Sequence, residues 1–254
     1  AVSLSVFLAL LDYAIANVAL PDIARDLRAS SSSSIWIVKA YQMASLVSLL
    51  PLAALGSRVG FARLCRAGIL LFMVASLLCA MATSLPVLAG ARVLQGIGGA
   101  CIMSVNIALV RFIYPSAEIG RGMALNGLVV ALGVALGPTA AAGILTFASW
   151  SWLFWINLPL GAAALGMAFY ALPNTPRAPH MPDMTGSLLC VLAFGACLMG
   201  GDGPPPAQGW VGSFLLPLRG LLAAVALLGL VASAAPPTVP RRRRPTAIRT
   251  RWPP

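Results

Sequence analysis

The sequence predicts an all-α, polytopic membrane protein. The chain has 254 residues, of which 59% are hydrophobic and 9% are charged, and its mean hydropathy is +0.91. A soluble domain is nearer half apolar and a quarter charged, so this chain lacks the polar side chains to cover a surface in water. Apolar runs of roughly 20 residues recur along it, the length that a helix needs to cross a bilayer. These runs are too long and too continuous for the strands of a membrane barrel, and only helices remain.

About eight apolar runs meet that length. Hydropathy places them near residues 1–21, 35–56, 64–84, 87–110, 122–147, 152–172, 184–201 and 214–235. We expect the first six runs to form one six-helix bundle over residues 1–172. A cytoplasmic loop and two further membrane helices are expected over residues 173–235. Residues 236–254 are dominated by Pro and Arg and have no helical or strand period, which predicts a disordered tail.

Basic residues gather in alternate connections between the predicted spans. The connections after spans two, four and six, and the tail, are basic, whereas those after spans three and five carry no Lys or Arg. The basic residues concerned are Arg58, Arg63, Arg66, Arg111, Arg121, Arg177 and Arg241 to Arg244. By the positive-inside rule, the even connections and the N-terminus are cytoplasmic. The net charge of +11 is therefore assigned to loops, and no nucleic-acid partner is expected.

An acidic residue lies inside the first span. The stretch from Leu11 to Pro21 reads LDYAIANVALP, and Asp12 is the only charge before Pro21. A charge at mid-bilayer costs about 2.5–3.5 kcal/mol on insertion scales, so such residues usually face a cavity or a partner and mark a pathway. Burial in a low dielectric favours the neutral carboxyl group, which brings proton exchange within reach. The alternative is that Asp12 lies near a helix end and reaches water. Asn17 is a second polar candidate of this span, on a different helical face.

The fourth predicted span carries an arginine. Arg92, Gln95, Gly96 and Gly99 recur at i, i+3, i+4 and i+7 and therefore share one helical face. A polar residue followed by glycines on one face suits close helix packing with a polar crevice above it. The alternative is that Arg92 lies near a helix end and extends to the membrane surface.

The fifth predicted span contains the stretch GVALGPTAAAG. Gly133 and Gly137 form a GxxxG step, which allows another helix to approach closely. Pro138 lacks an N–H and clashes with the preceding turn, which predicts a kink. The alternative is an ordinary packing kink without a functional role.

No pattern in the sequence indicates an enzyme, a metal site or a cofactor. The five cysteines are scattered, and no CxxC motif or Cys/His cluster occurs. His180 is the single histidine and lies in a Pro-rich stretch. No nucleophile–base pair or phosphate-binding loop is found. We therefore expect no enzymatic activity and no cofactor.

Several segments carry patterns whose order and spacing occur together in one family of transporters. The pattern LDxTIVNVALP is matched at Leu11, Asp12, Ile15, Asn17, Val18, Ala19, Leu20 and Pro21. The pattern WxxxxY is matched at Trp36 and Tyr41, RxxQGxGxA at Arg92, Gln95, Gly96, Gly98 and Ala100, and GxxxGPxxGG at Gly133, Gly137 and Pro138. The stretch SWSWLFWINLPLG, at residues 149–161, resembles WRWxFxINxPxG, and Asp183 with Gly186 resembles the start of a seventh helix. Together these segments resemble the major facilitator superfamily, specifically its 14-helix drug:proton antiporter branch.

The connection between the second and third spans departs from the pattern of this family. Its gating motif, roughly GxLxDRxGRR, reads ALGSRVGFAR in this chain, so Ser57 stands where the family has an acid. Arg58, Gly60 and Arg63 remain in this segment. In the family the acid belongs to a charge network that closes the cytoplasmic gate, and Ser57 cannot supply that charge. Ala141 and Ala142 replace the closing glycines of the fifth-span pattern.

The resemblance implies proton-driven efflux of hydrophobic or cationic drugs or antibiotics across the cytoplasmic membrane. Asp12 would hold either a proton or a cationic substrate, and Arg92 would tune that exchange. Gly133, Gly137 and Pro138 would form a packing hinge that faces the other half of the transporter. The implied partners are a drug-like small molecule, protons and the lipid bilayer.

The resemblance also implies six further helices that this chain does not contain. We therefore expect a missing C-terminal half, or another subunit, to be needed for transport, and we expect the chain to begin inside its first helix. The Pro/Arg-rich tail is consistent with a frameshift or a truncation. Two alternatives remain: a metabolite exporter of the same superfamily, and a non-transporting fragment or decayed copy.

Overall fold

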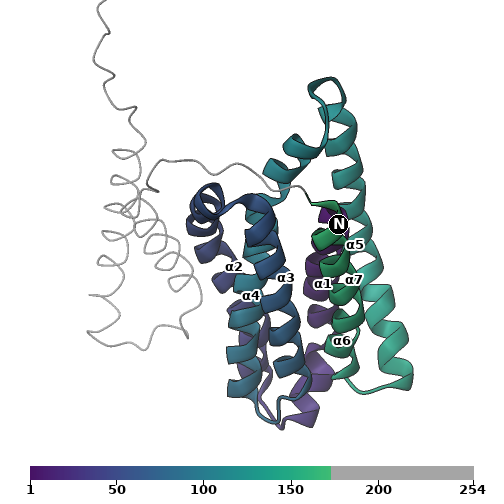
Figure 1. The fold of residues 1–254 in the computed structure, drawn as a ribbon. Coiled ribbons are helices and arrows are strands. Elements are labelled where there is room, and N and C mark those ends of the chain that lie inside the picture. Colours follow the sequence, from purple (N-terminus) through teal and green to yellow (C-terminus); the bar gives the residue numbers. More distant parts are fainter. Residues whose placement is uncertain (173–254) are drawn as a thin grey trace, which may run out of the picture.

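The computed structural model describes residues 1–172 of the chain (Figure 1). The predicted segment at 173–235, with its spans at 184–201 and 214–235, and the tail at 236–254 lie outside the described residues. Within residues 1–172, six helical stretches are long and apolar enough to cross a membrane, and no strand is present. The all-helical fold class predicted from the sequence is confirmed.

Seven α-helices and one short 3₁₀ helix make up these six stretches. They are α1 (Val2–Asp26), α2 (Ser31–Val59), α3 (Phe61–Ala80), α4 (Leu85–Ile113), η1 (Ser116–Glu118), α5 (Ile119–Phe147), α6 (Trp152–Trp155) and α7 (Asn157–Ala171). The last two form a single span that is interrupted at Ile156. Pro159 explains the interruption, because its nitrogen cannot donate to the carbonyl of Trp155 and its ring crowds that carbonyl.

Most of the helices extend beyond the bounds that hydropathy predicts, although α3 ends at Ala80, short of the predicted position 84. α1 continues through Pro21 to Asp26, and α2 begins at Ser31. The helices α2 and α3 are separated by Gly60 alone, whose φ of 105° is a conformation that favours glycine. Hydropathy ends a span where polar and charged residues become frequent, whereas backbone hydrogen bonding continues into that polar region.

This extension corrects the prediction that three arginines lie in the connection between the second and third spans. Arg58 lies in the last turn of α2, and Arg63 and Arg66 lie in the first two turns of α3. Arg66 reaches the end of α7, where its Nε and Nη2 donate to the carbonyls of Ala168 (3.0 Å) and Leu172 (2.9 Å). A cation at a helix C-terminus also interacts favourably with the helix dipole.

The helices pack as two groups (Figure 1). α4 lies between α2 and α3, while α1 packs chiefly against α5, with α7 beside α1 and α3. The apolar interior divides into two clusters, one around Leu8, Phe72 and Ile102 and the other around Ile15 and Leu88. Along α3 and α4, buried polar residues come between the residues of these two clusters, and on α1 Asp12 follows directly after the first residue of the second cluster. The bundle therefore has a polar layer near mid-depth, enclosed by apolar packing on both sides.

Glycines allow the close helix contacts that the sequence predicts. A Cβ on Gly96 would lie 2.5 Å from the carbonyl oxygen of Tyr41 in α2, and one on Gly98 would lie 2.8 Å from the nitrogen of Phe72 in α3. On α5, a Cβ on Gly137 would lie 2.2 Å from the Cβ of Ala14 in α1. Contacts this short cannot exist, so only glycine permits the observed helix separations.

The substitution Gly137→Ala is expected to destabilise the bundle by about 1–3 kcal/mol, because the added methyl group has no room against Ala14. Gly127→Ala is the matched control, since it lies on the same helix and its added Cβ would meet nothing within 4 Å. The control should be neutral or slightly stabilising, because alanine favours helix. The measurement is the thermal denaturation midpoint of the purified chain. Equal midpoints for the two variants would contradict the observed packing of α1 on α5.

Candidate functional site

A buried ion pair lies in the polar layer of the bundle. The Nη1 of Arg92 in α4 donates to the Oδ2 of Asp12 in α1 over 2.6 Å, and the two side chains are 0% and 1% exposed. Asp12 is ten residues into α1, which places it roughly 15 Å along a helix that rises about 1.5 Å per residue. Neither side chain reaches the surface, so the alternative of a charge extending to water is not supported for either residue.

Two amides and a hydroxyl complete the surroundings of the carboxylate. The Oδ1 of Asp12 accepts hydrogen bonds from the Nε2 of Gln95 (2.9 Å) and the Nδ2 of Asn157 (2.6 Å). The Nε2 of Gln95 also donates to the Oγ of Ser76 (2.8 Å), and its Oε1 accepts from Arg92 (2.7 Å). We call Asp12, Ser76, Arg92, Gln95 and Asn157 the carboxylate cluster. They come from α1, α3, α4 and α7, and each is at most 1% exposed.

Three hydrogen bonds therefore converge on the Asp12 carboxylate, one from a cation and two from amides. Hydrogen bonds to a charged group contribute about 1.5–3 kcal/mol each, so this arrangement suits the ionised form of Asp12. The pair is neutral overall, which is how two charges can be accommodated at this depth.

Aromatic rings flank the guanidinium group of Arg92. Its central carbon lies 4.4 Å from the ring centroid of Tyr41 in α2 and 5.8 Å from that of Phe154 in α6. Both distances are within the range of cation–π attraction. The Nη2 of Arg92 is buried and has no hydrogen-bond partner. The guanidinium is thus held by the Asp12 carboxylate, the amide oxygen of Gln95, two rings and a longer contact from its Nε to the carbonyl of Ile37 (3.5 Å), while its Nη2 is unsatisfied.

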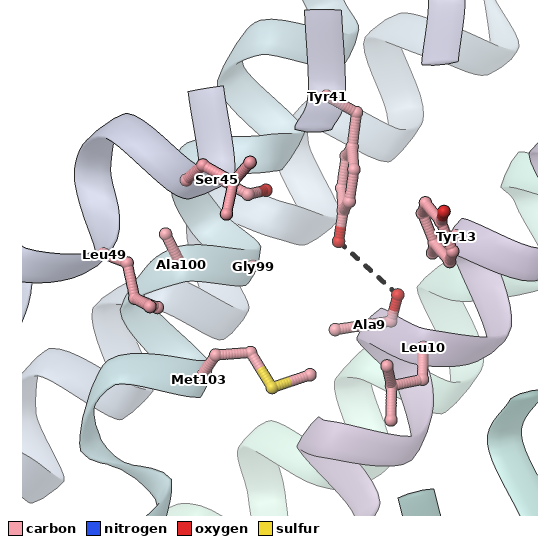
Figure 2. A pocket seen from close by; sticks show the side chains of 10 residues that line it. Ala9, Leu10, Tyr13, Tyr41, Ser45, Leu49, Gly99, Ala100 and Met103 are labelled. Atoms are coloured by element: carbon pink, nitrogen blue, oxygen red, sulfur yellow. Dashed lines mark hydrogen bonds between the residues drawn. The ribbon is translucent and has the colours of Figure 1, made fainter. Parts of the chain in front are cut away.

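A small cavity lies beside Tyr41 (Figure 2). It has a volume of about 170 Å³ and lies between α1, α2 and α4, with walls that include Leu10, Tyr13, Leu49 and Met103. The hydroxyl of Tyr41 donates to the carbonyl of Ala9 over 3.4 Å at its edge (Figure 2). Tyr41 therefore lines this cavity and also lies within cation–π distance of the guanidinium of Arg92.

The structure brings together three of the four residues predicted for proton and substrate handling. Asp12, Arg92 and Gln95 are in direct contact. Asn17 is not with them: its side chain is exposed, and its Nδ2 donates to the carbonyl of Tyr13 one turn earlier (2.8 Å).

The predicted gating residues lie at the junction of α2 and α3, away from the carboxylate cluster. The Oγ of Ser57 donates to the carbonyl of Ala54 in its own helix (2.7 Å). Arg58 and Arg63 are exposed, and neither forms an ion pair with another residue in the range 1–172. Gly60 forms the sharp turn between the helices.

The predicted hinge residues face a different neighbour from the one expected. Gly133 and Gly137 are buried against α1 of the same bundle, where Cβ atoms on them would lie 3.1 Å from Leu10 and 2.2 Å from Ala14. This corrects the expectation that these glycines face the other half of the transporter. Pro138 is exposed on α5. The motif therefore sets the distance between α1 and α5.

Sequence reasoning missed Asn157 and Ser76 as members of the site. Asn157 occurs in the apolar stretch WLFWINLPLG, where a single amide in a membrane span is itself a signal of helix–helix hydrogen bonding. Ser76 gives no such signal, because a serine can bond to its own helix, as its Oγ also does to the carbonyl of Phe72. In the described part of the chain, no group of three or more His, Cys, Asp or Glu side chains could hold a metal ion.

Comparison with known proteins identifies relatives along most of the chain. A family model described as Major Facilitator Superfamily matches residues 2–241. The chain is 49% identical over 194 residues to the uncharacterized transporter YebQ of Escherichia coli. The matched region covers 76% of this chain and 42% of YebQ. It is 32% identical to the riboflavin transporter RibZ of Clostridioides difficile, covering 77% of this chain and 42% of the relative. It is also 32% identical to the multidrug export protein EmrB of Haemophilus influenzae, and this match covers 91% of this chain and 46% of EmrB.

The solved structures agree on the fold. The human organic anion transporter MFSD10 superimposes with a TM-score of 0.63 at 19% sequence identity, covering 87% of this chain and 58% of that one. The chain spans less than half the length of these three curated relatives.

Proposed function

Because the chain belongs to the Major Facilitator Superfamily, a family of membrane transporters rather than enzymes, we propose that it is the N-terminal bundle of a proton-coupled exporter of hydrophobic or cationic drugs. The buried ion pair between Asp12 and Arg92 is the observation that carries this proposal. The similarity to a multidrug export protein supports the substrate class.

The energetics of a buried ion pair favour a functional role for it. Removing two charges from water costs several kcal/mol per ion, and their attraction rarely exceeds that cost by much. A well-packed apolar pair would serve stability at least as well. Intramembrane ionisable residues are accordingly more often part of a transport pathway than of the packing.

The proposed mechanism is a competition for one carboxylate. In the described conformation Arg92 and two amides occupy Asp12, and the site is closed to solvent. A proton on Asp12 would neutralise it and weaken its attraction for Arg92. A cationic substrate group would instead replace that proton as the counter-charge. Since Asp12 cannot hold both stably, binding of one releases the other, which couples the two fluxes.

Tyr41 provides a physical link between substrate and proton in this mechanism. The cavity beside it measures about 170 Å³, and an apolar cavity of about 150 Å³ can hold a benzene molecule. It could therefore accept one ring of a hydrophobic substrate. A ring that displaces Tyr41 would also disturb the cation–π contact that holds Arg92.

Transport would need more than this bundle. Substrate sites of such transporters lie near the bilayer midplane between two structural repeats, and alternating access moves one repeat against the other. We propose that the second half comes from further helices of the same transporter or from another subunit. The family match supports a location in the cell membrane, and the arrangement of basic residues supports an N-terminus on the cytoplasmic side.

A metabolite exporter is the second candidate, and one finding favours it. The riboflavin transporter RibZ is as similar to this chain, at 32% identity, as the multidrug export protein. The carboxylate cluster would serve either substrate class, because it handles the proton. The walls of the substrate cavity decide between them, and those of the second half are outside this chain.

A substrate panel tests the proposed function. Cells that lack their own multidrug pumps and express the transporter containing this chain should accumulate less ethidium than control cells. A protonophore should restore ethidium accumulation, because the export depends on the proton gradient. Riboflavin levels should be unaffected. Export of riboflavin with unchanged ethidium accumulation would instead establish the metabolite exporter. Cells that express residues 1–254 alone show whether export requires the second half.

A further inference from the structure

An unsatisfied atom lies beside the Asp12 carboxylate. The side chain of Asn157 is 0% exposed, and its Nδ2 donates to the Oδ1 of Asp12 over 2.6 Å. Its other end, Oδ1, is buried with no hydrogen-bond partner. A buried polar atom without a partner costs about 1–3 kcal/mol, and such atoms call for an explanation.

A protonated Asp12 would need an acceptor that its present surroundings do not offer. All three of its contacts are donors, from Arg92, Gln95 and Asn157, which suit a carboxylate. A neutral carboxylic acid has an O–H that must itself donate. The Oε1 of Gln95 already accepts from Arg92 and from Cys79. The Oγ of Ser76 already accepts from Gln95 and lies 3.5 Å from the Nδ2 of Asn157.

Among the described side chains that contact Asp12, Asn157 is the one with a free acceptor, its Oδ1. The two ends of an amide are nearly identical in shape, so a half-turn of the amide exchanges a donor for an acceptor in the same place. We propose that Asn157 is a protonation-reading switch of the transporter: its amide donates to ionised Asp12 and turns over to accept from protonated Asp12. This proposal rests on the proposed function, because it assumes that Asp12 exchanges protons.

The two orientations of the Asn157 amide are close in energy, because each leaves one end of the amide without a hydrogen-bond partner. In the described orientation the end facing away from Asp12 has no partner, and after a half-turn the opposite end takes that place. One end of the amide lacks a partner either way, and the half-turn gives up only the long contact of 3.5 Å from Nδ2 to the Oγ of Ser76, so the protonation state of Asp12 decides which orientation is more stable. A side chain that could only donate would favour the ionised form alone.

The position of Asn157 gives the switch a connection to the backbone. It is the first residue of α7, directly after the interruption at Ile156 that Pro159 explains. Pro159 removes a backbone hydrogen bond at this interruption, so the start of α7 is less constrained than a position in mid-helix. Protonation of Asp12 in α1 would thereby act on the α6–α7 span.

The other ionisable groups near Asp12 do not take over this role. Arg92 from α4 stays charged, and the hydroxyl of Tyr41 from α2 is bonded to a backbone carbonyl. The thiol of Cys79 from α3 donates to Gln95 over 3.5 Å. Within residues 1–172, α7 has no charged side chain, and the single charged residue of α5, Arg121, lies near the start of that helix.

Infrared difference spectroscopy of the 254-residue chain, reconstituted in lipid and titrated with acid, tests the switch directly. Labelled asparagine identifies the amide C=O stretch, and Asn157→Leu assigns the band of that residue; Asn157→Ser serves if the leucine variant does not fold. Asn17→Leu is the matched control, because Asn17 is exposed and bonded only to its own helix. The carboxylic C=O band lost in Asp12→Asn reports protonation of Asp12.

The expected result is that the Asn157 amide C=O band moves to lower wavenumber as the Asp12 acid band emerges, since that carbonyl then accepts a hydrogen bond. The shift should be present in Asn17→Leu and absent in Asp12→Asn. An acid band from Asp12 with an unchanged Asn157 band would overturn the switch and leave the proposed function standing. If no acid band from Asp12 emerged at any pH at which the chain stays folded, both the switch and proton exchange at Asp12 would fall.

Discussion

The substitution Asp12→Asn is expected to abolish proton-driven efflux. Asparagine preserves the shape of the side chain and can still accept from Arg92, but it cannot bind or release a proton. Export of a cationic dye should therefore fall to the level of cells without the transporter. The measurement is ethidium efflux from energised cells, with the amount of transporter in the membrane determined in parallel.

Asp22→Asn is the matched control for this prediction. It lies on the same helix, and its carboxylate pairs with Arg25, whose side chain is largely exposed, near the end of α1. Efflux should be unchanged in this variant, because surface ion pairs contribute little. Unimpaired efflux by Asp12→Asn, at normal membrane levels, would show that the coupling group lies elsewhere.

Loss of Arg92 should be the most destabilising single change in the carboxylate cluster. Arg92→Met leaves the Asp12 carboxylate buried without its counter-charge, which costs about 3–5 kcal/mol for a pair of this kind. The double variant Asp12→Asn/Arg92→Met removes both charges and should recover most of that loss. The free energy of unfolding in mixed micelles measures the effect.

Arg111→Met is the control for the arginine substitution, since Arg111 is exposed in the last turn of α4. Its effect should be within about 0.5 kcal/mol of zero, as for surface substitutions generally. A double variant no more stable than Arg92→Met would mean that the two charges are not energetically coupled. Stability recovered without recovered efflux is the expected combination, because the role proposed for the pair is in transport rather than in folding.

The fold can be predicted from the sequence because the bilayer imposes a length on every span. Hydropathy locates all six spans within residues 1–172, but it does not locate their ends. It assigns Arg58 and Arg63 to a loop, whereas they lie on helices joined by Gly60 alone. Charge marks where a helix leaves the apolar region, while the helix itself ends where the backbone turns, and these are different residues.

The site is predictable only in part, for a related reason. Asp12 and Arg92 stand out because a charge in an apolar span is costly, and Gln95 follows from its spacing on the same helical face. Asn157 cannot be placed with them from sequence, because it is 145 positions from Asp12 and meets it only through tertiary packing. Asn17 is near Asp12 in sequence but on another face of α1, which shows that proximity along a helix is a poor guide to contact.

The hinge motif shows what a family pattern does not specify. The spacing of Gly133 and Gly137 correctly indicates a close helix contact, and the partner is α1. Since α1 carries Asp12, the glycines fix the distance at which α5 supports the helix that bears the carboxylate. Their role in transport would then be to hold Asp12 in position.

Proton release on substrate binding tests most directly whether substrate and proton compete for Asp12. Ethidium, once shown to bind, is added to the purified transporter in weakly buffered solution, and a pH-sensitive dye reports released protons. Competition predicts release from the wild type, at a pH where Asp12 is protonated, and none from Asp12→Asn. Equal proton release from both would contradict the claim that substrate and proton share this carboxylate.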